Sequence, residues 1–317
     1  MEKVLITGIT GQDGIFLTKA LLESTSNISI VGTSRSIENK NFFMNLNRIY
    51  SGSNQNLKIL KLNFNESNKV FGFLEDYKPT QIYNLMGPSS VYESFLNNSN
   101  KNTIVSNFDN LVGSLIKQKN FCNFFQASSS EMFDVSKYKL NEESSMKPRS
   151  PYAEAKYKNH LSVKQLNEEY SWNIKSGIMF NHESEYRSNQ YLFMKIINAA
   201  ANIKSRNITK FSLGSLKYIR DWSFAGDFAE ALISICQDKK ENSYVIGSGK
   251  GTSIKEIVEI VFDYYKLNWE NHLEIDSSIL RKGDPEVIIS DPNLIKNNIG
   301  WESTTSIENL IQRCIKK

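Results

Sequence analysis

The residues with the clearest chemical potential are Tyr152 and Lys156, which form the motif YAEAK. Two side chains four residues apart on a helix lie on the same face. An ammonium beside a phenol favours the phenolate, so this spacing predicts a tyrosine that acts as a base below its ordinary pKa of about 10. The lysine can also hold the ribose of a nicotinamide cofactor. Because YxxxK pairs are common by chance, the position of this one has to support that interpretation.

A second chemical group precedes that pair by about 20 residues, where Ser128, Ser129 and Ser130 lead into Glu131. These residues follow an apolar run at 121–127 that has the character of a buried strand. Hydroxyl groups at a strand end can hydrogen-bond a sugar oxygen, and Glu131 adds a carboxylate acid/base. An alcohol dehydrogenase or an epimerase needs only the tyrosine and a hydroxyl. The added carboxylate therefore favours elimination of water.

A glycine-rich turn near the N-terminus predicts a phosphate site. Gly8, Gly11 and Gly14 in GITGQDG follow the apolar run 3–7 and precede a helical pattern at 14–22. Glycine lets the backbone turn tightly and approach a pyrophosphate, while the following helix N-terminus presents free N–H groups and partial positive charge. The alternative is an ordinary strand-to-helix turn. The GxxGxxG spacing is typical of the extended short-chain dehydrogenase/reductase superfamily.

The end of the second predicted strand favours NADP(H) over NAD. NAD sites place an acidic residue there for the ribose 2′-hydroxyl, whereas NADP sites often use arginine for the 2′-phosphate. Here residues 32–36 read GTSRS, with Arg35 and no acid. The competing interpretation is that Arg35 is a solvated loop cation.

Positioning these groups requires a sheet with strands alternating with helices. Short apolar runs at 3–7, 28–32, 57–62, 81–85, 121–127 and 175–180 alternate with helical patterns, which predicts an α/β, Rossmann-type, doubly wound parallel sheet. We expect helices at 188–201, 227–237 and 253–265, a strand at 211–218, and a loop or short helix at 34–56. The predicted domains are residues 1–181 for NADP binding and 182–317 mainly for substrate, with the chain returning to the first around 221–250.

Composition excludes several classes of protein. With 317 residues, 40% of them hydrophobic, and a net charge of +4, the chain can bury a full core and is not mainly disordered. We expect no nucleic-acid partner, no membrane span, no signal peptide and no metal site. The three cysteines (Cys122, Cys236 and Cys314) are widely spaced, which fits a reducing, cytoplasmic location without a disulfide framework.

Over nearly its whole length the sequence resembles the GDP-mannose 4,6-dehydratase family of the extended short-chain dehydrogenase/reductase superfamily. Beyond GITGQDG, the stretches that carry the resemblance are IYNLMGPSSV (82–91), QASSSEMF (126–133), PRSPYAEAK (148–156), IMFNHES (178–184), FSLGSLKYIRDW (211–222) and YVIGSGKGTSIKEIVE (244–259). The resemblance implies C4 oxidation of a GDP-sugar, water elimination across C5–C6 and hydride return to C6. It also implies tightly bound NADP(H), regenerated each turnover, and a homodimer or homotetramer.

The resemblance also assigns site residues. Catalytic roles fall on Ser129, Glu131, Tyr152 and Lys156; Ser129 stands where the family usually has threonine, so the hydroxyl is kept. Cofactor contacts fall on Thr7, Gly8, Gly11, Gln12, Asp13, Gly14, Arg35, Asn63, Leu85, Ser89, Tyr152, Lys156 and His182. Substrate contacts fall on Ser89, Ser129, Glu131, Asn181, Glu183, Lys195, Arg220 and Arg281.

Several departures from the family pattern leave the hexose open. Asn63 replaces a usual aspartate where the resemblance implies contact with the adenine of the cofactor. Around the sugar, Pro88 and Ser90 replace residues that are often Gln and His, and Glu185-Tyr186 replace a Pro-Arg or Pro-Leu pair. RKGD at 281–284 replaces RPTD or RPTE. We expect these changes to cluster around the sugar. The alternatives are a dehydratase of another GDP-sugar, such as GDP-N-acetylglucosamine or GDP-manno-heptose, a GDP-sugar epimerase or reductase, and a non-catalytic nucleotide-binding subunit. The intact set Ser129, Glu131, Tyr152 and Lys156 argues against the last.

Overall fold

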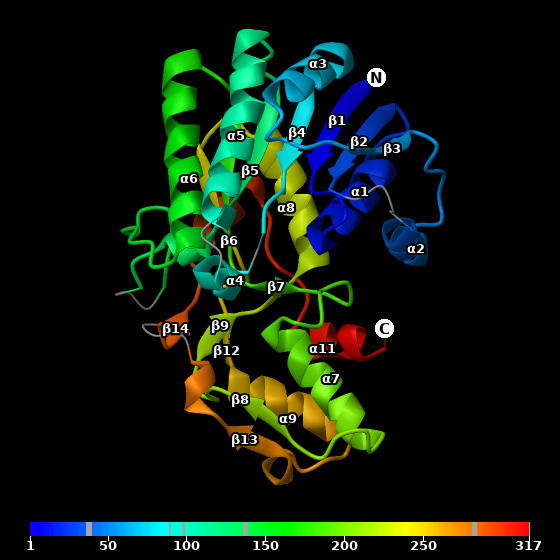
Figure 1. The fold of residues 1–317 in the computed structure, drawn as a ribbon, viewed down its shortest axis with the longest axis vertical. Coiled ribbons are helices and arrows are strands. Elements are labelled where there is room, and N and C mark those ends of the chain that lie inside the picture. The colour runs from blue at the N-terminus through cyan, green and yellow to red at the C-terminus, as the bar shows by residue number, and fades with distance from the viewer. Residues whose placement is uncertain (36–39, 89, 97–98, 136–138, 281–283, 317) are drawn as a thin grey trace.

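The fold is centred on a seven-stranded parallel sheet with helices on both faces (Figure 1). The computed structural model describes residues 1–35, 40–88, 90–96, 99–135, 139–280 and 284–316. Strand order is β11-β6-β5-β4-β1-β2-β3, so the direction of winding reverses between β1 and β4. The strands are β1 (Glu2–Thr7), β2 (Ile28–Ser34), β3 (Leu57–Lys61), β4 (Gln81–Asn84), β5 (Asn123–Ser129), β6 (Ile174–Met179) and β11 (Ser243–Ile246).

Alternation of side chains along the strands builds two separate cores. Val4 and Ile6 of β1 face one side, where they join the core under α1 (Gln12–Ser24), α2 (Lys40–Ile49) and α8 (Ala225–Gln237). Leu5 faces the other side, under α3 (Ser67–Tyr77), α5 (Ser99–Lys117) and α6 (Pro151–Tyr170). Because both faces are covered at the centre of the sheet, β1 is apolar without interruption from Val4 to Ile6, whereas the edge strand β3 (LKILK) is partly exposed.

A smaller lobe lies beyond the carboxyl ends of the strands (Figure 1). Its core joins α7 (Leu192–Lys204), α9 (Ile254–Tyr264) and α11 (Ile307–Ile315). Small sheets complete it, formed by β8 (Phe211–Leu213) with β13 (Leu273–Ile275) and by β12 (Gly251–Ser253), β9 (Ile219–Asp221) and β14 (Val287–Ile288). β7 (His182–Glu183) pairs with β10 (Ser223–Phe224). The remaining helices are α4 (Val91–Leu96) and α10 (Asn293–Ile299), with short 3-10 turns η1 (Ser130–Met132), η2 (Trp269–Asn271) and η3 (Ser277–Ile279).

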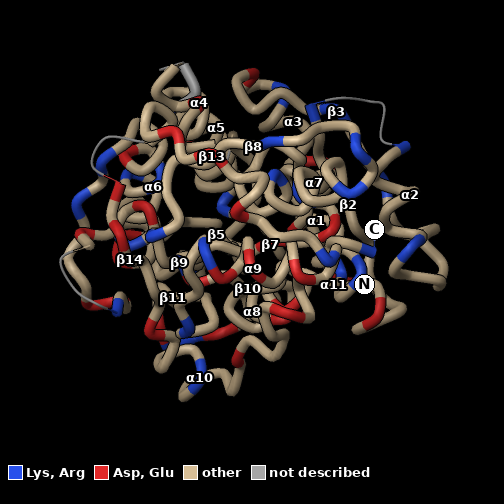
Figure 2. The backbone as a smooth tube through the Cα atoms, turned by 90° about the horizontal axis from the view of Figure 1, so that it is seen from below, with Lys and Arg blue, Asp and Glu red and all other residues tan. Residues whose placement is uncertain are grey.

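The expected α/β class and parallel sheet are confirmed, with differences at element ends. The strand expected at 211–218 ends at Leu213, and the segment 34–56 contains helix α2. The chain after the boundary predicted at 181 contributes α8 and the edge strand β11 to the main sheet layer. No helix within the described ranges is both long and apolar enough to cross a membrane. In Figure 2, basic and acidic residues are interspersed along the backbone.

Candidate active site

A cavity of about 1160 Å³ opens between the carboxyl ends of the sheet strands and the smaller lobe. Residues from both β1 and β4 ends line it, which places it at the point where the strand order reverses. Ligands of open α/β sheets bind in such crevices. Its volume exceeds that of a common small-molecule pocket, so it has room for two extended ligands.

The glycine turn forms one end of the cavity, and at two of its glycines there is no room for a side chain. Gly8 has φ +71°, and a Cβ there would lie 2.9 Å from the Cα of Met86. Gly11 precedes α1 as its N-cap residue and lines the cavity. Gly14 does not line it; a Cβ on Gly14 would meet the carbonyl oxygen of Ile9 at 2.1 Å, so this glycine permits close packing of helix on turn.

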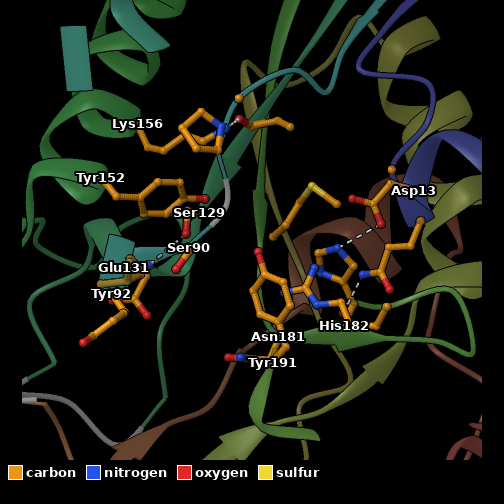
Figure 3. Close-up of a pocket in the computed structure, with 18 of the residues that line it drawn as sticks. Asp13, Ser90, Tyr92, Ser129, Glu131, Tyr152, Lys156, Asn181, His182 and Tyr191 are labelled. Carbon is orange, nitrogen blue, oxygen red and sulfur yellow. Dashed lines mark hydrogen bonds and ion pairs between the residues drawn. The ribbon is translucent and has the colours of Figure 1, made fainter. Parts of the chain in front are cut away.

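The four predicted catalytic residues, Ser129, Glu131, Tyr152 and Lys156, come from β5, η1 and α6 and line one wall of the cavity, which we call the catalytic wall after that prediction. Helix α6 begins where the side chain of Ser150 accepts a hydrogen bond from the N–H of Ala153, which places Tyr152 in the first turn. The Tyr152 hydroxyl hydrogen-bonds with the side chain of Ser129. Ser129 Oγ also accepts the backbone N–H of Glu131 at 3.3 Å, which leaves its proton available for donation. Figure 3 shows these groups facing the cavity.

The expectation that Lys156 lowers the pKa of Tyr152 is wrong for the protein alone. Lys156 Nζ donates to the carbonyl oxygen of Ala127 at 2.8 Å. Burial raises the pKa of Tyr152 to about 12, helped by the charge of Glu131 and opposed by the Ser129 hydrogen bond. Burial also lowers the pKa of Lys156 to about 8, against the pull of Asp13. Desolvation of both groups outweighs the i,i+4 attraction that the sequence suggested.

On the opposite wall, two residues of the turn hold the segment 182–184 in an arrangement we call the clasp: Gln12 and Asp13 with His182 and Ser184. Gln12 Nε2 donates to the His182 carbonyl at 2.8 Å, and Ser184 Oγ donates to Gln12 Oε1 at 2.9 Å. His182 Nε2 lies 3.0 Å from Asp13 Oδ1, and its Nδ1 lies 2.7 Å from the Phe180 carbonyl oxygen. The contact to the Phe180 carbonyl takes the Nδ1 proton, and the carboxylate beside Nε2 favours a second proton, so the arrangement favours the imidazolium form of His182.

The pKa directions agree with that assignment. Burial opposes the charge on His182, but the Asp13 carboxylate outweighs it and raises the histidine pKa. For Asp13, burial again opposes ionisation, yet His182 brings the pKa below its ordinary value. The clasp is therefore a largely buried ion pair that joins residues far apart in sequence.

Arg187 and Tyr191 are cavity residues that sequence reasoning missed. The Arg187 guanidinium lies 3.6 Å from the centre of the Tyr191 ring, and its Nε is 3.2 Å from Glu183 Oε2. Burial raises the pKa of Glu183, and Arg187 partly offsets this. The i,i+4 spacing of an acid and a base inside NHESEYR was the one signal that could have found Arg187.

The predicted diphosphate ligands lie on the smaller-lobe side of the cavity. Lys195 of α7 and Arg220 of β9 both line it. Arg220 NH2 is 3.3 Å from Asp284 Oδ1, and both side chains are nearly buried. NH1 of Arg220 donates to the carbonyl oxygens of Ile219 and Glu286 at 2.9 and 3.2 Å. The guanidinium is thus held in a fixed orientation with part of its charge already balanced.

Two basic side chains line the rim of the cavity where β2 and β3 end. Arg35 is exposed and lines the cavity, and Lys61, which sequence analysis did not select, lies on β3 opposite Ser34. Asn63 also lines the cavity, and its Oδ1 accepts the N–H of Asn65 at 3.1 Å.

Most predicted site residues share this one cavity. Those that line it are Gly8, Gly11, Gln12, Asp13, Arg35, Asn63, Leu85, Ser129, Glu131, Tyr152, Lys156, Asn181, His182, Glu183, Lys195 and Arg220. Thr7 is fully buried beneath the turn and does not line it. Ser89 and Arg281 lie outside the described residues. Among the described residues, no group of three or more His, Cys, Asp or Glu side chains could hold a metal ion.

We expected the departures from the family pattern to cluster around the sugar, but they do not all line the cavity. Pro88 and Ser90 line the cavity, but Glu185 and Tyr186 do not. Glu185 pairs with Arg313 of α11 at 2.9 Å, and the Tyr186 hydroxyl donates to the Asn45 carbonyl at 3.3 Å. Packing between the C-terminal helix, α2 and this loop accounts for that pair, so it is no guide to the sugar.

Together, the parallel sheet, the glycine turn and the tyrosine–lysine helix define a nicotinamide-dependent enzyme of the short-chain dehydrogenase/reductase type. The solved dTDP-glucose 4,6-dehydratase of Bacillus anthracis, in complex with NAD, shares this fold with a TM-score of 0.85 at 18% identity, covering 100% of this chain and 96% of that one.

Sequence comparison places the chain more narrowly. Residues 5–314 match the family model for GDP-mannose 4,6 dehydratase. GDP-mannose 4,6 dehydratase 1 of Arabidopsis thaliana is 33% identical, covering 98% of this chain and 88% of that protein. The human GDP-mannose 4,6 dehydratase is 29% identical, covering 98% and 90%. The chain belongs to the GDP-mannose 4,6-dehydratase family, which confirms the predicted enzyme class, a nucleotide-sugar 4,6-dehydratase.

Proposed function

We propose that this protein is an NADP-dependent dehydratase that converts GDP-mannose to GDP-4-keto-6-deoxymannose, with Ser129, Glu131, Tyr152 and Lys156 as its catalytic residues. The observation that carries this proposal is the convergence of all four side chains on one wall of a cavity whose far end is the glycine turn. The relatives named above carry the substrate in their names, and the site offers the chemistry that such a reaction needs.

The residues present fit a dinucleotide. Gly8 has a backbone conformation and a neighbour distance that leave no room for a side chain, and the N-terminus of α1 opens beside it. Those N–H groups would hold the pyrophosphate, with Arg35 and Lys61 at the rim for a 2′-phosphate. When bound, NADP⁺ supplies the hydride acceptor for C4 and, in reduced form, the donor for C6, so it ends each turnover oxidised.

The first proton transfer falls to Tyr152. To oxidise C4, the O4 proton must leave with the hydride, and the Tyr152 oxygen is the base that faces the cavity beside Ser129. The Ser129 hydroxyl hydrogen-bonds with the Tyr152 oxygen and orients it. Because Tyr152 has a pKa of about 12 in the protein alone, it works as a base only where nearby positive charge stabilises the phenolate. An oxidised nicotinamide, when bound, would supply such charge, and Lys156 on the same helix face would add to it.

The elimination step falls to Glu131. A ketone at C4 acidifies the C5 proton, and Glu131 lies on the turn that directly follows Ser129. The carboxylate takes the C5 proton and returns one to the C6 hydroxyl, which leaves as water, so that a C5–C6 double bond forms. Hydride returned to C6 and a proton from solvent added to C5 then complete the 4-keto-6-deoxy sugar. General acid/base steps of this kind contribute about 10²- to 10⁴-fold each.

The test uses Glu131→Gln, with solvent deuterium as the probe. The wild-type protein should turn GDP-mannose into a 4-keto-6-deoxy product with deuterium at C5 and no net consumption of NADPH. The variant should still oxidise C4, so reduced cofactor should accumulate while C5 exchange is lost. Undiminished C5 exchange in the variant would show that Glu131 is not the base. Stoichiometric use of NADPH by the wild type would support a reductase instead.

The sugar itself is tested by parallel assays. Pro88 and Ser90 line the cavity in place of the family's usual residues, so GDP-N-acetylglucosamine and GDP-manno-heptose belong in the same mass-spectrometric screen. If either compound gave a higher kcat/KM than GDP-mannose, the proposed 4,6-dehydration would stand, but the proposed substrate would change.

A further inference from the structure

Gln126 is a buried polar residue for which the mechanism above has no use. It lies on β5, the third strand from the β11 edge of the sheet, and its side chain is 1% exposed. A buried amide without partners is costly to the folded state by about 1 to 3 kcal/mol, so its hydrogen bonds indicate why it is there.

Gln126 ends a chain of hydrogen bonds that crosses three strands. The backbone N–H of Met86 donates to Thr7 Oγ1 at 3.3 Å, and Thr7 Oγ1 donates to Asn84 Oδ1 at 2.6 Å. Asn84 Nδ2 donates to Gln126 Oε1, also at 2.6 Å. Gln126 Nε2 then donates to the carbonyl oxygen of Ala127 at 2.9 Å.

The direction of these hydrogen bonds is fixed by the end at Ala127. A backbone carbonyl can only accept, so Gln126 must turn its Nε2 toward Ala127 and its Oε1 toward Asn84, which in turn orients the Asn84 amide and makes the Thr7 hydroxyl the donor. Thr7, Asn84 and Gln126 are all at most 2% exposed, and water has little access to replace a lost link. Breaking one link therefore leaves a buried group unpaired.

The chain ends on the same oxygen that holds the catalytic lysine. Lys156 Nζ and Gln126 Nε2 both donate to the Ala127 carbonyl, at 2.8 and 2.9 Å, which uses its two lone pairs. Paired residues of β4 and β5 end at Asn84 and Gln126, so this carbonyl lies just past that ladder. The donors to the Ala127 carbonyl oxygen are therefore the side chains of Gln126 and Lys156.

We propose that Gln126 is a positioning residue: with Asn84 and Thr7 it fixes the Ala127 carbonyl, and through that carbonyl it fixes the Lys156 ammonium against the cofactor. The proposal rests on the function proposed above, because it gives Lys156 its task. Since Thr7 directly precedes the Gly8 turn, the same chain ties the phosphate-binding strand to the catalytic helix.

The electrostatic setting of Lys156 makes the test specific. Asp13 of α1 acts on the Lys156 ammonium, and the Tyr152 ring of the same helix lies 5.8 Å from its Nζ. Asp13 in turn feels the charges of His182 and Arg187. Asp13 raises the lysine pKa, while burial lowers it to about 8. Removing the Gln126 amide takes away an N–H donor that competes with the ammonium for the shared carbonyl oxygen. Without the competing donor, the carbonyl oxygen accepts more strongly from the ammonium, so the pKa of Lys156 should rise.

The experiment compares Gln126→Met with the matched control Gln81→Met in the full-length protein. Gln81 is also a buried glutamine, 6% exposed on β4, and it accepts a hydrogen bond from Tyr83 without contact to Lys156. The Lys156 titration is followed by NMR of ¹³Cε-labelled lysine, with Lys156→Arg to assign its signal. In parallel, kcat and KM are measured with GDP-mannose.

For Gln126→Met we expect an upward shift of the Lys156 midpoint and a kcat lower by about 10- to 100-fold at nearly constant KM, the range that a small misplacement of a catalytic group produces. Gln81→Met should lose comparable stability but keep the midpoint and kcat within about twofold. Identical behaviour of the two variants would overturn the proposal.

A second variant guards against misfolding of the first. In Gln126→Glu, the ionised side chain cannot donate to Ala127, whereas the protonated form can. Its activity relative to wild type should therefore recover as pH falls, and a pH-independent defect would contradict the positioning role. If wild type fails to dehydrate GDP-mannose, the proposed function fails, yet the lysine titration still decides whether Gln126 positions Lys156.

Discussion

On the catalytic wall, the Lys156 ammonium donates to a neutral carbonyl and Tyr152 shares a hydrogen bond with a neutral hydroxyl. On the clasp, by contrast, the charges meet each other, as Asp13 does with His182. The two charges of an ion pair neutralise each other, which can hold two segments together. Neither charge is then free to stabilise charge that develops on a substrate during a reaction. The groups of the catalytic wall bond to neutral partners, so their charges are not cancelled in advance. This difference distinguishes the wall to which we assign the chemistry from the contact that joins the two parts of the fold.

The largest effect should come from the catalytic wall. Tyr152→Phe removes the oxygen proposed to accept the O4 proton while keeping the ring, which packs with Val91 of α4 and Ile104 of α5. We expect turnover to fall by about 10²- to 10⁴-fold, with bound NADP⁺ remaining oxidised after GDP-mannose is added. Absorbance of reduced nicotinamide in a single turnover measures this. Melting temperature serves as the control, and a variant that still reduces its cofactor at the wild-type rate would remove Tyr152 from the mechanism.

The clasp should instead govern stability. Asp13→Asn leaves the His182 imidazolium facing a neutral amide, and breaking a buried ion pair costs several kcal/mol. Since the imidazole can release its proton, we expect the free energy of unfolding to fall by roughly 3 kcal/mol, measured by urea denaturation.

The pH dependence of that loss tests the cause. His182 has a raised folded pKa, so its contribution is full below its ordinary value of 6.5 and is lost as pH rises through the folded pKa. Asp13 has a lowered folded pKa, so its contribution is present above 3.8 and is lost as pH falls through the folded value. The difference in free energy of unfolding between wild type and Asp13→Asn should therefore be largest between pH 3.8 and pH 6.5. It should decrease at alkaline pH, where His182 loses its proton. A gap that does not change with pH would argue against an ion pair.

A smaller, selective effect is expected at the rim. Arg35→Asp places a carboxylate where a 2′-phosphate would lie and a 2′-hydroxyl can be accepted. The preference for NADP⁺ over NAD⁺ in direct binding titrations should fall by about 10- to 100-fold, the equivalent of one charge-assisted hydrogen bond. Lys61→Asp is the matched variant, because Lys61 lines the same rim. Equal affinity of the wild type for both cofactors would contradict the prediction.

The smallest effect should follow loss of the Glu185–Arg313 pair, which lies outside the cavity. Arg313 is 43% exposed on its side chain, so solvent screens the pair. Arg313→Ala should lower the free energy of unfolding by about 1 kcal/mol or less and leave kcat unchanged. A large loss of activity would mean that the C-terminal helix shapes the site more than its contacts indicate.

Local patterns in the sequence were enough to predict the sheet, the glycine turn and the tyrosine–lysine helix face. Gly8 and Gly14 are required by backbone sterics within a few residues, and Tyr152 and Lys156 share a face because helical spacing places them there. Family resemblance then supplied residues such as Lys195 and Arg220, which lie in the same cavity.

Only the tertiary structure decided what these groups do to one another. Asp13 and His182 are separated by most of the first domain, and no periodicity predicts that they pair. The raised pKa of Tyr152 and the lowered pKa of Lys156 come from burial, which depends on how α6 packs against β5 and the neighbouring elements. Likewise, Gln126 reaches Lys156 through one carbonyl because three strands end at the same edge of the sheet. Desolvation and long-range pairing depend on the complete fold, whereas turns and helix faces depend on a few neighbouring residues.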